Sequence, residues 1–564
     1  MLRSYDRVPH DDAEKPERRS WRTSSRSPVH EDGPVQPADQ LDRALLALLR
    51  DDLTRARYGV DAVRELWGEA AGEALHRGDR VPARRALADD SAPLATLARL
   101  FLLADPVATE AAAAAFASLG LEGAIALGLV QSEAGAVVTA AIDLRPYDLV
   151  DLRGAASWWI ASDLGELALG RALSEDHVLG VGGASLTLTG LMIQRPVGSV
   201  LDLGTGCGIQ ALHASRHAER VVATDISERA LAFAAFNAAL NGIESIEFRL
   251  GSLYEPVAGE RFDHIVTNPP FVITPRTEGV PSYEYRDGGL EGDEIVHRVI
   301  VGAADHLVPG GVAQLLGNWE YRESADAFDR VRGWLDDVRS PLAQALEPSP
   351  EGLDAWIEAA ASPLDVWIVE RERQDPAVYA ETWIRDGGTT RGAEFDQLVD
   401  AWVGDFERRG VTGVGFGYVT LRLPATPRPP LRRFERIDAA FATAGLGGHL
   451  AHCLDAAEAL AALDDDALTG LALTVAGDVT EERHYWPGND DPTVLRLRQG
   501  GGFARVEDVD TAVAAVVGAS DGELSLAAIV AAVASLLHVE EAAVLESVLP
   551  PVRELIATGV LHLP

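Results

Sequence analysis

Residues 201–208 read LDLGTGCG and decide the fold, because an apolar run ends in an acid and turns through alternate glycines into an apolar helix. The glycines are Gly204, Gly206 and Gly208. Glycine lets a ligand approach the backbone closely and adopts positive φ without strain. The dinucleotide fingerprint requires its third glycine at position 209, which is Ile209, so the spacing disfavours NAD or FAD.

A second motif, IVTNPPF over residues 265–271, follows Asp202 by about sixty residues. The Asn268 side-chain oxygen and the Pro269 carbonyl can accept both hydrogens of a planar NH₂ group. Prolines fix φ and so hold that geometry, and the Phe271 ring can stack on a flat amide or base. We therefore expect a catalytic site for a planar nitrogen, which works by positioning and electrostatics. Its residues are Asn268, Pro269, Pro270 and Phe271.

Polar residues between the motifs follow two further strands. Asp225 ends the second strand, 23 residues after Asp202, and Ile226 comes next. A carboxylate at this place accepts hydrogen bonds from ribose hydroxyls in nucleotide-binding sheets. Ser252 and Leu253 follow the third strand and are expected beside an adenine ring. All of these positions meet at the carboxyl edge of a parallel sheet, where open α/β folds bind ligands.

Residues 173–423 alternate between strand and helix patterns, which predicts a Rossmann-like α/β domain with a seven-stranded sheet. We expect helices from Ile209, from Ser227 to Leu240, and near Glu394–Glu407, the last joining an antiparallel edge pair. The expected strands are Ser199–Leu203, Arg220–Asp225, Ile246–Leu250, Phe262–Asn268, Gly311–Leu316, Leu364–Glu370 and Val414–Leu423.

These motifs together make residues 173–423 resemble a class I S-adenosylmethionine-dependent methyltransferase of the Asn-Pro-Pro-aromatic subgroup. That subgroup includes release-factor glutamine methyltransferases and methyltransferases of adenine or guanine amines in RNA and DNA. Residues 251–256 and 287–293, with Arg298, are similar to segments of the glutamine methyltransferases. Ser252 departs from the pattern, since an Asp commonly contacts the adenine amine there.

The resemblance implies S-adenosyl-L-methionine as cofactor and a methyl group displaced from its sulfonium onto the nitrogen held by Asn268. Residues 177–185 precede the first strand and are expected to form a lid near the methionine end, although a plain glycine-rich connection explains them equally well. The expected cofactor-binding residues are Asp202, Gly204, Thr205, Gly206, Gly208, Asp225, Ile226, Ser252, Leu253 and Asn268.

The flanking regions predict two further domains. Residues 1–36 have the composition of a disordered tail. Residues 37–172 show helical spacing and then a small hairpin near residues 129–140, which together resemble a winged-helix unit. The proline-rich residues 424–430 are expected to be a linker. Residues 431–564 predict helices, including ones from Val506 and Ser525, around a strand at 493–497, again winged-helix-like.

Bulk composition sets limits on partners and compartment. The net charge of −38 opposes binding to long nucleic acid by charge alone. The two cysteines form neither a disulfide framework nor a zinc cluster, which suits a reducing cytosol. The longest apolar stretch, residues 524–539, is too short for a membrane span and predicts a core helix. We expect a cytoplasmic protein without membrane contact; the oligomeric state stays open.

Several other residues could suggest chemistry but are expected to have structural roles. His213 and His217 have the spacing of a metal pair, yet without a third ligand they are expected to be surface histidines. Cys207 is expected to pack rather than to act as a nucleophile. The Trp158–Trp159 and Tyr485–Trp486 pairs are expected in a core or an interface rather than stacked on bases.

Three functions remain open at this point. A protein glutamine methyltransferase acting on a translation factor fits the acidic composition and the glycine-rich residues 287–292. An RNA, or less readily DNA, base-amine methyltransferase fits the winged-helix-like flanks and Phe271. A non-catalytic protein that binds S-adenosylmethionine is disfavoured by the intact motif at residues 268–271.

Overall fold

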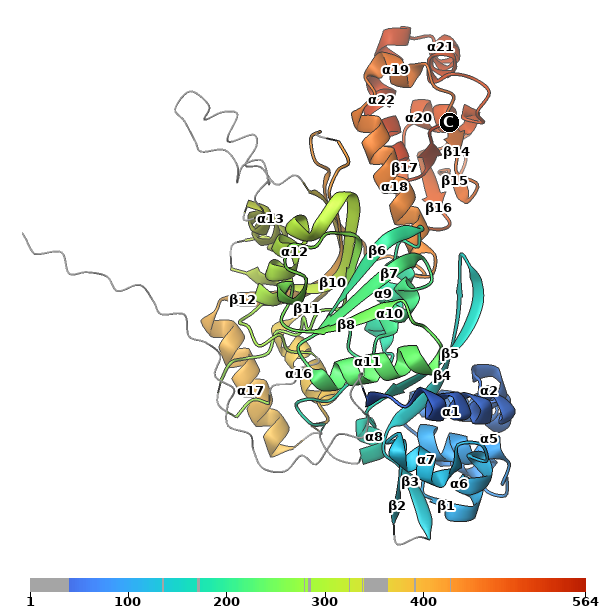
Figure 1. Cartoon of the computed structure of the whole chain (residues 1–564). Helices are drawn as coiled ribbons and strands as arrows, with labels where there is room; N and C mark the ends of the chain where they lie inside the picture. The colour runs from blue at the N-terminus through green and yellow to red at the C-terminus, as the bar shows by residue number, and fades with distance from the viewer. Residues whose placement is uncertain are drawn as a thin grey trace, which may run out of the picture. The chain divides into compact units, whose positions relative to one another are not determined.

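The computed structural model describes residues 40–564 (Figure 1), apart from 134–135, 170–172, 278, 282–285, 324, 337, 339–363, 390–391 and 427. The expected tail of residues 1–36 lies outside the described residues.

The middle of the chain is built on a mixed sheet, to which the described residues contribute eight strands in the order β13-β11-β12-β10-β9-β6-β7-β8. Strands β8, β7, β6, β9 and β10 run parallel to one another, while β12 is antiparallel to both β10 and β11. The strands are β6 (Val197–Leu203), β7 (Ala218–Asp225), β8 (Ile246–Leu250), β9 (Phe262–Thr267), β10 (Leu307–Arg322), β11 (Asp365–Gln374), β12 (Val411–Arg422) and β13 (Arg432–Arg436).

The seven expected strands all form, and the α/β fold class is confirmed. The eighth strand, β13, pairs in parallel with β11 although it lies beyond the expected linker. The sheet therefore continues past residue 430, and β13 rather than the β11–β12 pair forms this edge. Strand β12 lies inside the sheet, between β10 and β11.

Helices of this domain follow the sequence signals. Ser227 caps α11 by accepting a hydrogen bond from Ala230 N at 3.4 Å. Apolar residues lie around most of α11, and the helix is accordingly buried on most of its surface. The helices are α9 (Gly183–Leu191), α10 (Ile209–Ala214), α11 (Glu228–Leu240), η3 (Glu255–Val257), α12 (Glu294–His306), α13 (Ala327–Asp336), α16 (Pro376–Asp386) and α17 (Ala393–Arg408).

The N-terminal region has the element order of a winged helix within its described residues: helix, short strand β1, two helices and the expected hairpin β2–β3. A longer hairpin, β4–β5, follows it and was not anticipated. The elements are α1 (Arg43–Arg55), α2 (Val60–Trp67), α3 (Glu69–His76), α4 (Val81–Ala86), α5 (Pro93–Leu97), η2 (Ala98–Leu102), β1 (Val107–Ala108), α6 (Thr109–Ala115), α7 (Gly120–Ala126), β2 (Val130–Glu133), β3 (Val137–Ala140), β4 (Asp143–Asp151), β5 (Gly154–Ser162) and α8 (Glu166–Leu169).

One hydrophobic core joins this N-terminal region to the sheet domain. It contains Phe101 and Trp158 from the N-terminal elements together with Cys207, Phe233 and Phe236 from the turn after β6 and from α11. The expectation that Cys207 and Trp158 serve packing is confirmed. Removing the N-terminal region would expose the face of α11 that carries the two phenylalanines.

The C-terminal region differs from expectation at Val506, which begins strand β17 rather than a helix, because residues 494–509 pair as a meander with β15. Ser525 caps α21 as expected. The elements are α18 (Leu446–Ala461), α19 (Asp465–Thr469), β14 (Thr474–Val475), β15 (Val479–His484), β16 (Val494–Gln499), β17 (Val506–Val509), α20 (Thr511–Ala519), α21 (Leu526–Leu537), α22 (Glu541–Ala557) and β18 (Leu561–His562).

Helix α21 covers the long apolar stretch noted in the sequence and buries one face, including Leu526 and Ile529. Within the described residues, no helix combines the length and the apolarity required to cross a membrane.

Candidate active site

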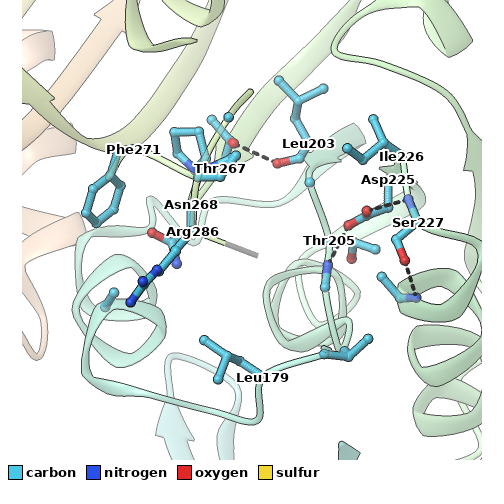
Figure 2. A pocket seen from close by; sticks show the side chains of 18 of the residues that line it. Leu179, Leu203, Thr205, Asp225, Ile226, Ser227, Thr267, Asn268, Phe271 and Arg286 are labelled. Carbon is cyan, nitrogen blue, oxygen red and sulfur yellow. Dashed lines mark hydrogen bonds between the residues drawn. The ribbon is translucent and has the colours of Figure 1, made fainter. Parts of the chain in front are cut away.

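The carboxyl ends of β6, β7, β8 and β9 open onto a cavity of about 450 Å³. Residues from the turn after each of these strands line it, together with residues 176–180 and 182–185, which precede β6. Figure 2 shows Asp225, Ile226 and Ser227 at one side of the cavity and Asn268, Phe271 and Arg286 at the opposite side. The glycine turn, whose Gly206 N donates to Asp225, thus lies at one end of the cavity (the glycine end), and the Asn-Pro-Pro-Phe turn lies at the other (the motif end).

The glycine turn after β6 serves the cavity and the packing behind it in different ways. Gly204 and Gly206 line the cavity at φ +73° and +54°, and a Cβ atom on either would point into open space. Gly208 lies at φ +87° and does not line the cavity; its Cβ would come within 3.0 Å of Ala234 in α11. The first two glycines leave room for a ligand, and the third lets the turn approach the helix.

Asp202 lies behind this turn rather than in the cavity lining. Its Oδ2 accepts hydrogen bonds from Thr205 Oγ1 at 2.6 Å and from Ala211 N at 2.9 Å. The carboxyl group is fully buried, and this burial raises its pKa to about 7. Asp202 therefore holds the turn in this structure, and its expected role in cofactor binding stays a prediction.

Asp225 does face the cavity. Its carboxylate accepts hydrogen bonds from Gly206 N at 3.0 Å and from Ser227 N at 2.9 Å, so it also fixes the glycine turn. Burial raises the pKa of this carboxyl group. Ile226 lines the cavity with 57% of its surface exposed, an apolar surface against which a ring could lie.

The remaining expected cofactor residues also line the cavity, namely Thr205, Ser252 and Leu253. The Thr205 hydroxyl group donates its hydrogen bond to Asp202. Leu253 has φ +47°, an uncommon conformation for a residue that is not glycine and one that concentrates at functional sites. Ser252 is exposed, which is compatible with its short side chain leaving room for a ligand.

The glycine-rich residues 176–185 lie along the same cavity. The carboxylate of Asp163, just after β5, accepts a hydrogen bond from Val178 N at 2.8 Å and another from Arg229 Nε of α11 at 2.9 Å. This pair fastens the segment to α11. The expected lid position is thus compatible with the structure, although the lid function stays a prediction.

Asn268 follows β9 directly, at the end of the cavity away from Asp225. Thr267 Oγ1 donates to Leu203 O at 2.6 Å and so ties the end of β9 to the end of β6. Asn268 Oδ1 is buried and accepts no hydrogen bond from the described part of the chain. A buried acceptor without a partner is costly, so this oxygen is suited to receive a donor from a ligand.

The Asn-Pro-Pro-Phe turn is held by the segment after it. Gly288 N donates to Pro270 O at 3.1 Å, and Val272 N donates to Arg286 O at 2.8 Å. Pro269 and Pro270 line the cavity. The Phe271 ring lines it as well but is only 8% exposed, because it packs on Phe416 and Trp383 with ring centroids 5.5 and 6.5 Å away.

Three lining residues at this end were not singled out from the sequence: Arg286, Trp383 and Asp386. Trp383 and Asp386 end helix α16, more than a hundred residues after Asn268, and reach the site because β11 and β12 lie beside β10. Arg286 lies in the segment that pairs with the motif. None of them belongs to a motif with a recognisable spacing.

The two histidines with metal-like spacing are buried, contrary to the expectation of surface residues. They are covered by the β4–β5 hairpin and the sheet: His213 Nε2 lies 2.9 Å from Tyr147 OH, and the His217 ring lies 5.9 Å from that of His264. Burial lowers the pKa of both to about 4. No group that could hold a metal ion occurs among the described residues.

The two aromatic pairs also differ. Trp159 donates from Nε1 to Tyr58 O at 2.7 Å and so belongs to the packed N-terminal region, as expected. Tyr485 and Trp486 are 49% and 67% exposed, because they lie in the turn between β15 and β16, which no core covers. The expectation of a core position is wrong for this second pair, and the alternative of an interface stays a prediction.

Comparison with known proteins agrees with this geometry. Residues 180–330 match the model of the methyltransferase small domain, and residues 55–141 and 452–563 each match a domain of unknown function. The middle of the chain is therefore similar to the methyltransferase small domain, and the cavity lies at the carboxyl edge of its sheet.

Individual relatives match parts of the chain. The ribosomal protein uL3 glutamine methyltransferase of Bradyrhizobium diazoefficiens is 36% identical over 203 residues, covering 33% of this chain and 58% of that protein. The release factor glutamine methyltransferase of Xylella fastidiosa is 40% identical over 129 residues, covering 22% and 47%. The ribosomal RNA small subunit methyltransferase C of Alcanivorax borkumensis is 32% identical over 150 residues, covering 27% and 39%. The chain thus spans about half the length of these relatives.

Proposed function

We propose that this chain is an S-adenosylmethionine-dependent N-methyltransferase that modifies the side-chain amide of a glutamine in a protein of the translation machinery. The observation that carries the proposal is the buried Asn268 Oδ1, which is without a partner in the described structure and lies in one cavity with the glycine turn. The relatives named glutamine methyltransferases support the choice of acceptor.

The glycine end fits the cofactor. Gly204 and Gly206 leave open space in the cavity because they carry no side chains. The Asp225 carboxylate faces the cavity and can accept hydrogen bonds from ribose hydroxyls. Ile226 and Leu253 offer apolar surface for the adenine ring. When bound, S-adenosylmethionine supplies the methyl group as an electrophilic sulfonium.

The motif end fits a primary amide. Asn268 Oδ1 and the Pro269 carbonyl can accept the two N–H groups, which fixes the plane of the amide and directs its nitrogen lone pair out of that plane. The prolines restrict the backbone that carries both acceptors. Catalysis then consists of holding the nitrogen in line with the methyl donor in a site largely shielded from water.

The winged-helix-like N-terminal region favours a protein over a nucleic acid. In a DNA-binding winged helix, the helix before the hairpin enters the major groove and carries basic residues to the phosphates. Here that helix is α7, whose seven residues GLEGAIA contain Glu122 and no arginine or lysine. With a net charge of −38 over the whole chain, electrostatics oppose docking on a polyanion.

Methylation of a ribosomal RNA base amine is the second candidate, because one relative carries the name of an RNA methyltransferase and Asn268 could hold an exocyclic NH₂ equally well. Action in the cytoplasm, on a release factor or a ribosomal protein, is part of the proposal.

Labelling separates the candidates. An extract of cells lacking this protein is incubated with the purified chain and S-adenosylmethionine tritiated in its methyl group, and protein and RNA are then counted apart. We expect a discrete protein band that is insensitive to ribonuclease and absent with Asn268→Ala. Label in RNA would establish the second candidate instead, and equal labelling by Asn268→Ala would contradict the proposed site.

A further inference from the structure

Arg286 is an arginine that is only 7% exposed and yet lines the motif end of the cavity. Its carbonyl accepts the hydrogen bond from Val272 N, and the next residue, Asp287, pairs with Phe271. The backbone of Arg286 is therefore locked to the strand-like continuation of the Asn-Pro-Pro-Phe turn. Figure 2 shows its side chain on the same side of the cavity as Asn268 and Phe271.

Helix α16 holds the guanidinium from behind. Arg286 Nη1 donates to Trp383 O at 2.7 Å and lies 3.3 Å from Asp386 Oδ2. A Cβ atom at the next residue of the chain, Gly387, would come within 2.9 Å of Nη2, so the glycine there makes room for the group. The charge is thus paired and the plane of the guanidinium is fixed at the edge of the cavity.

A primary amide presents more than its nitrogen to the site. Once Asn268 and Pro269 accept its two N–H groups, the amide carbonyl oxygen still requires a donor, because leaving a buried carbonyl unpaired is costly. Guanidinium groups carry five N–H donors in a rigid plane. Among the cavity-lining residues at the motif end, Arg286 carries the cationic side chain.

We propose that Arg286 contacts the acceptor directly, donating a hydrogen bond to the carbonyl oxygen of the amide whose nitrogen Asn268 holds. This inference rests on the proposed function and deepens it: it makes a carboxamide, rather than any NH₂ group, the recognised unit. Helix α16, which sets the Arg286 guanidinium, becomes part of substrate recognition.

The contact with Arg286 selects an amide as acceptor and orients it, but it does not make the amide nitrogen more nucleophilic. Donation to an amide oxygen draws the nitrogen lone pair further into the carbonyl, so it cannot make the nitrogen a better nucleophile. Its benefit is geometric. Three fixed contacts define the plane of the acceptor amide, whereas two contacts still allow the amide to rotate. Loss of Arg286 should therefore weaken acceptor binding as well as slow transfer, with little effect on the cofactor.

The test uses the full-length chain with tritiated S-adenosylmethionine and the protein fraction of an extract from cells lacking it. For Arg286→Met we expect kcat/KM for the extract protein to fall on the order of 10- to 100-fold, with a rise in KM. Affinity for S-adenosylmethionine, measured by calorimetry, should stay within about twofold. Arg286→Lys, which keeps a charged donor without the planar fork, should recover part of the loss.

Arg385→Met is the matched control, because Arg385 lies on the same helix beside Asp386 but pairs with Glu381 and does not line the cavity. It should behave as the wild type. Unchanged kcat/KM in Arg286→Met would overturn the inference, and so would a parallel loss of S-adenosylmethionine affinity in both Arg286→Met and Arg286→Lys, which would make the residue purely structural.

The failure of the proposed function has a different signature. If the wild-type chain labels RNA and no protein, the amide acceptor is wrong, whatever the variants do. If it labels protein and Arg286→Met labels it equally well, the proposed function stands and the role of Arg286 is refuted.

Discussion

Single side chains at the two ends of the cavity should have separable effects. Asp225→Ala removes a carboxylate that faces the cavity and fixes Gly206 N and Ser227 N, so the Kd for S-adenosylmethionine should rise about 10- to 100-fold. Asn268→Ala should leave that Kd within about twofold and lower kcat on the order of 10²- to 10³-fold, as expected for loss of one fixed electrostatic contact. Calorimetry and the tritium-transfer assay measure the two quantities.

Asn489→Ala provides the control, since Asn489 lies in the exposed turn between β15 and β16. It should change neither quantity. Near-normal transfer by Asn268→Ala would show that the nitrogen is held elsewhere.

Asp202 should make stability depend on pH. Its pKa is raised to about 7 in the folded chain by burial, against an ordinary value of 3.8. Between these two values the folded state binds the proton that the unfolded state has lost, so this residue's contribution falls as pH rises towards 7. Asp202→Asn cannot ionise. Its free energy of unfolding should therefore rise relative to that of the wild type on going from pH 5 to pH 8, by up to a few kcal/mol at about 1.4 kcal/mol per pKa unit, and its Tm should rise with it.

Thermal unfolding of both proteins at the two pH values measures this difference. Asp225 is unsuitable as the control because its own pKa is raised, whereas an exposed pair such as Asp61 with Arg64 is suitable. Asp61→Asn should show no change between the two pH values. The same Tm difference between Asp202→Asn and wild type at both pH values would contradict the prediction that the pKa of Asp202 is raised in the folded chain.

The sequence revealed those site residues whose role depends on local backbone geometry. Glycines that admit a ligand, an acid at a strand end and prolines after an asparagine each leave a local pattern, and all of these but Asp202 and Gly208 line the cavity. Those two face away, because residues of one tight turn point to both of its sides. Arg286 and Trp383 could not be foreseen, since their positions depend on pairings between distant segments.

At the scale of elements, α11 joins the N-terminal hairpin to the glycine turn through one buried amide. Asn237 Oδ1 accepts from Ala161 N at 2.7 Å, while Nδ2 donates to Ala161 O at 2.9 Å and to Cys207 O at 2.8 Å. Asn237→Ala would leave three buried groups without partners, at roughly 1–3 kcal/mol each. We expect a loss of stability of about 3–5 kcal/mol in urea denaturation, with weaker S-adenosylmethionine binding because the glycine turn is released.

Asn241, the C-cap of α11, makes the matched comparison one turn further along the chain. It pairs in the same way with the N–H and the carbonyl of Trp159, but it is only half-buried and does not reach the glycine turn. Asn241→Ala should cost less stability and spare cofactor affinity. Equal effects of the two variants would rule out a specific link to the turn.

Whether a segment forms a helix or a strand was predictable where one hydrophobic periodicity dominates its sequence. The predictions became unreliable where pairing with a distant strand decides the structure. Strands β6 to β9 follow from apolar runs bounded by turn residues. Val506 begins a strand instead of a helix because β16 offers it a ladder of backbone hydrogen bonds, which local propensity does not encode. For the same reason β13 joins the sheet although proline-rich sequence separates it from β12.

At the scale of the whole molecule, residues 424–430 have the composition of a linker, but the regions before and after them share one hydrophobic core. The large core of the sheet domain also contains Leu446, Leu450 and Phe503 from the C-terminal region. The ring of Phe503 packs on Trp367 of β11 with centroids 5.6 Å apart. Composition alone suggested separate domains because it cannot show which apolar faces are shared.

Asp365 is the residue that should keep this linker closed to proteases. It is 1% exposed, accepts hydrogen bonds from Leu431 N at 2.7 Å and from Arg428 Nη1 at 2.9 Å, and so ties the linker to the start of β11. Asp365→Ala leaves the Arg428 guanidinium without its carboxylate partner, at about 3–5 kcal/mol. We expect a protease of broad specificity to cut between residues 424 and 436 in this variant and to spare that segment in the wild type, because cleavage requires local opening.

Mass spectrometry of the fragments identifies the cut, and Asp329→Ala, which removes an exposed acid paired with Arg332, controls for charge loss alone. The order of events matters more than the final digest. If β13 belongs to the sheet, the first cleavage in Asp365→Ala should fall before β13 or within it, which separates the C-terminal region from β12. The affinity for S-adenosylmethionine should fall only after this cut. Rapid cleavage of the wild type at residues 424–430 would instead show a hinge between independent domains, in which β13 holds the β11 edge only transiently.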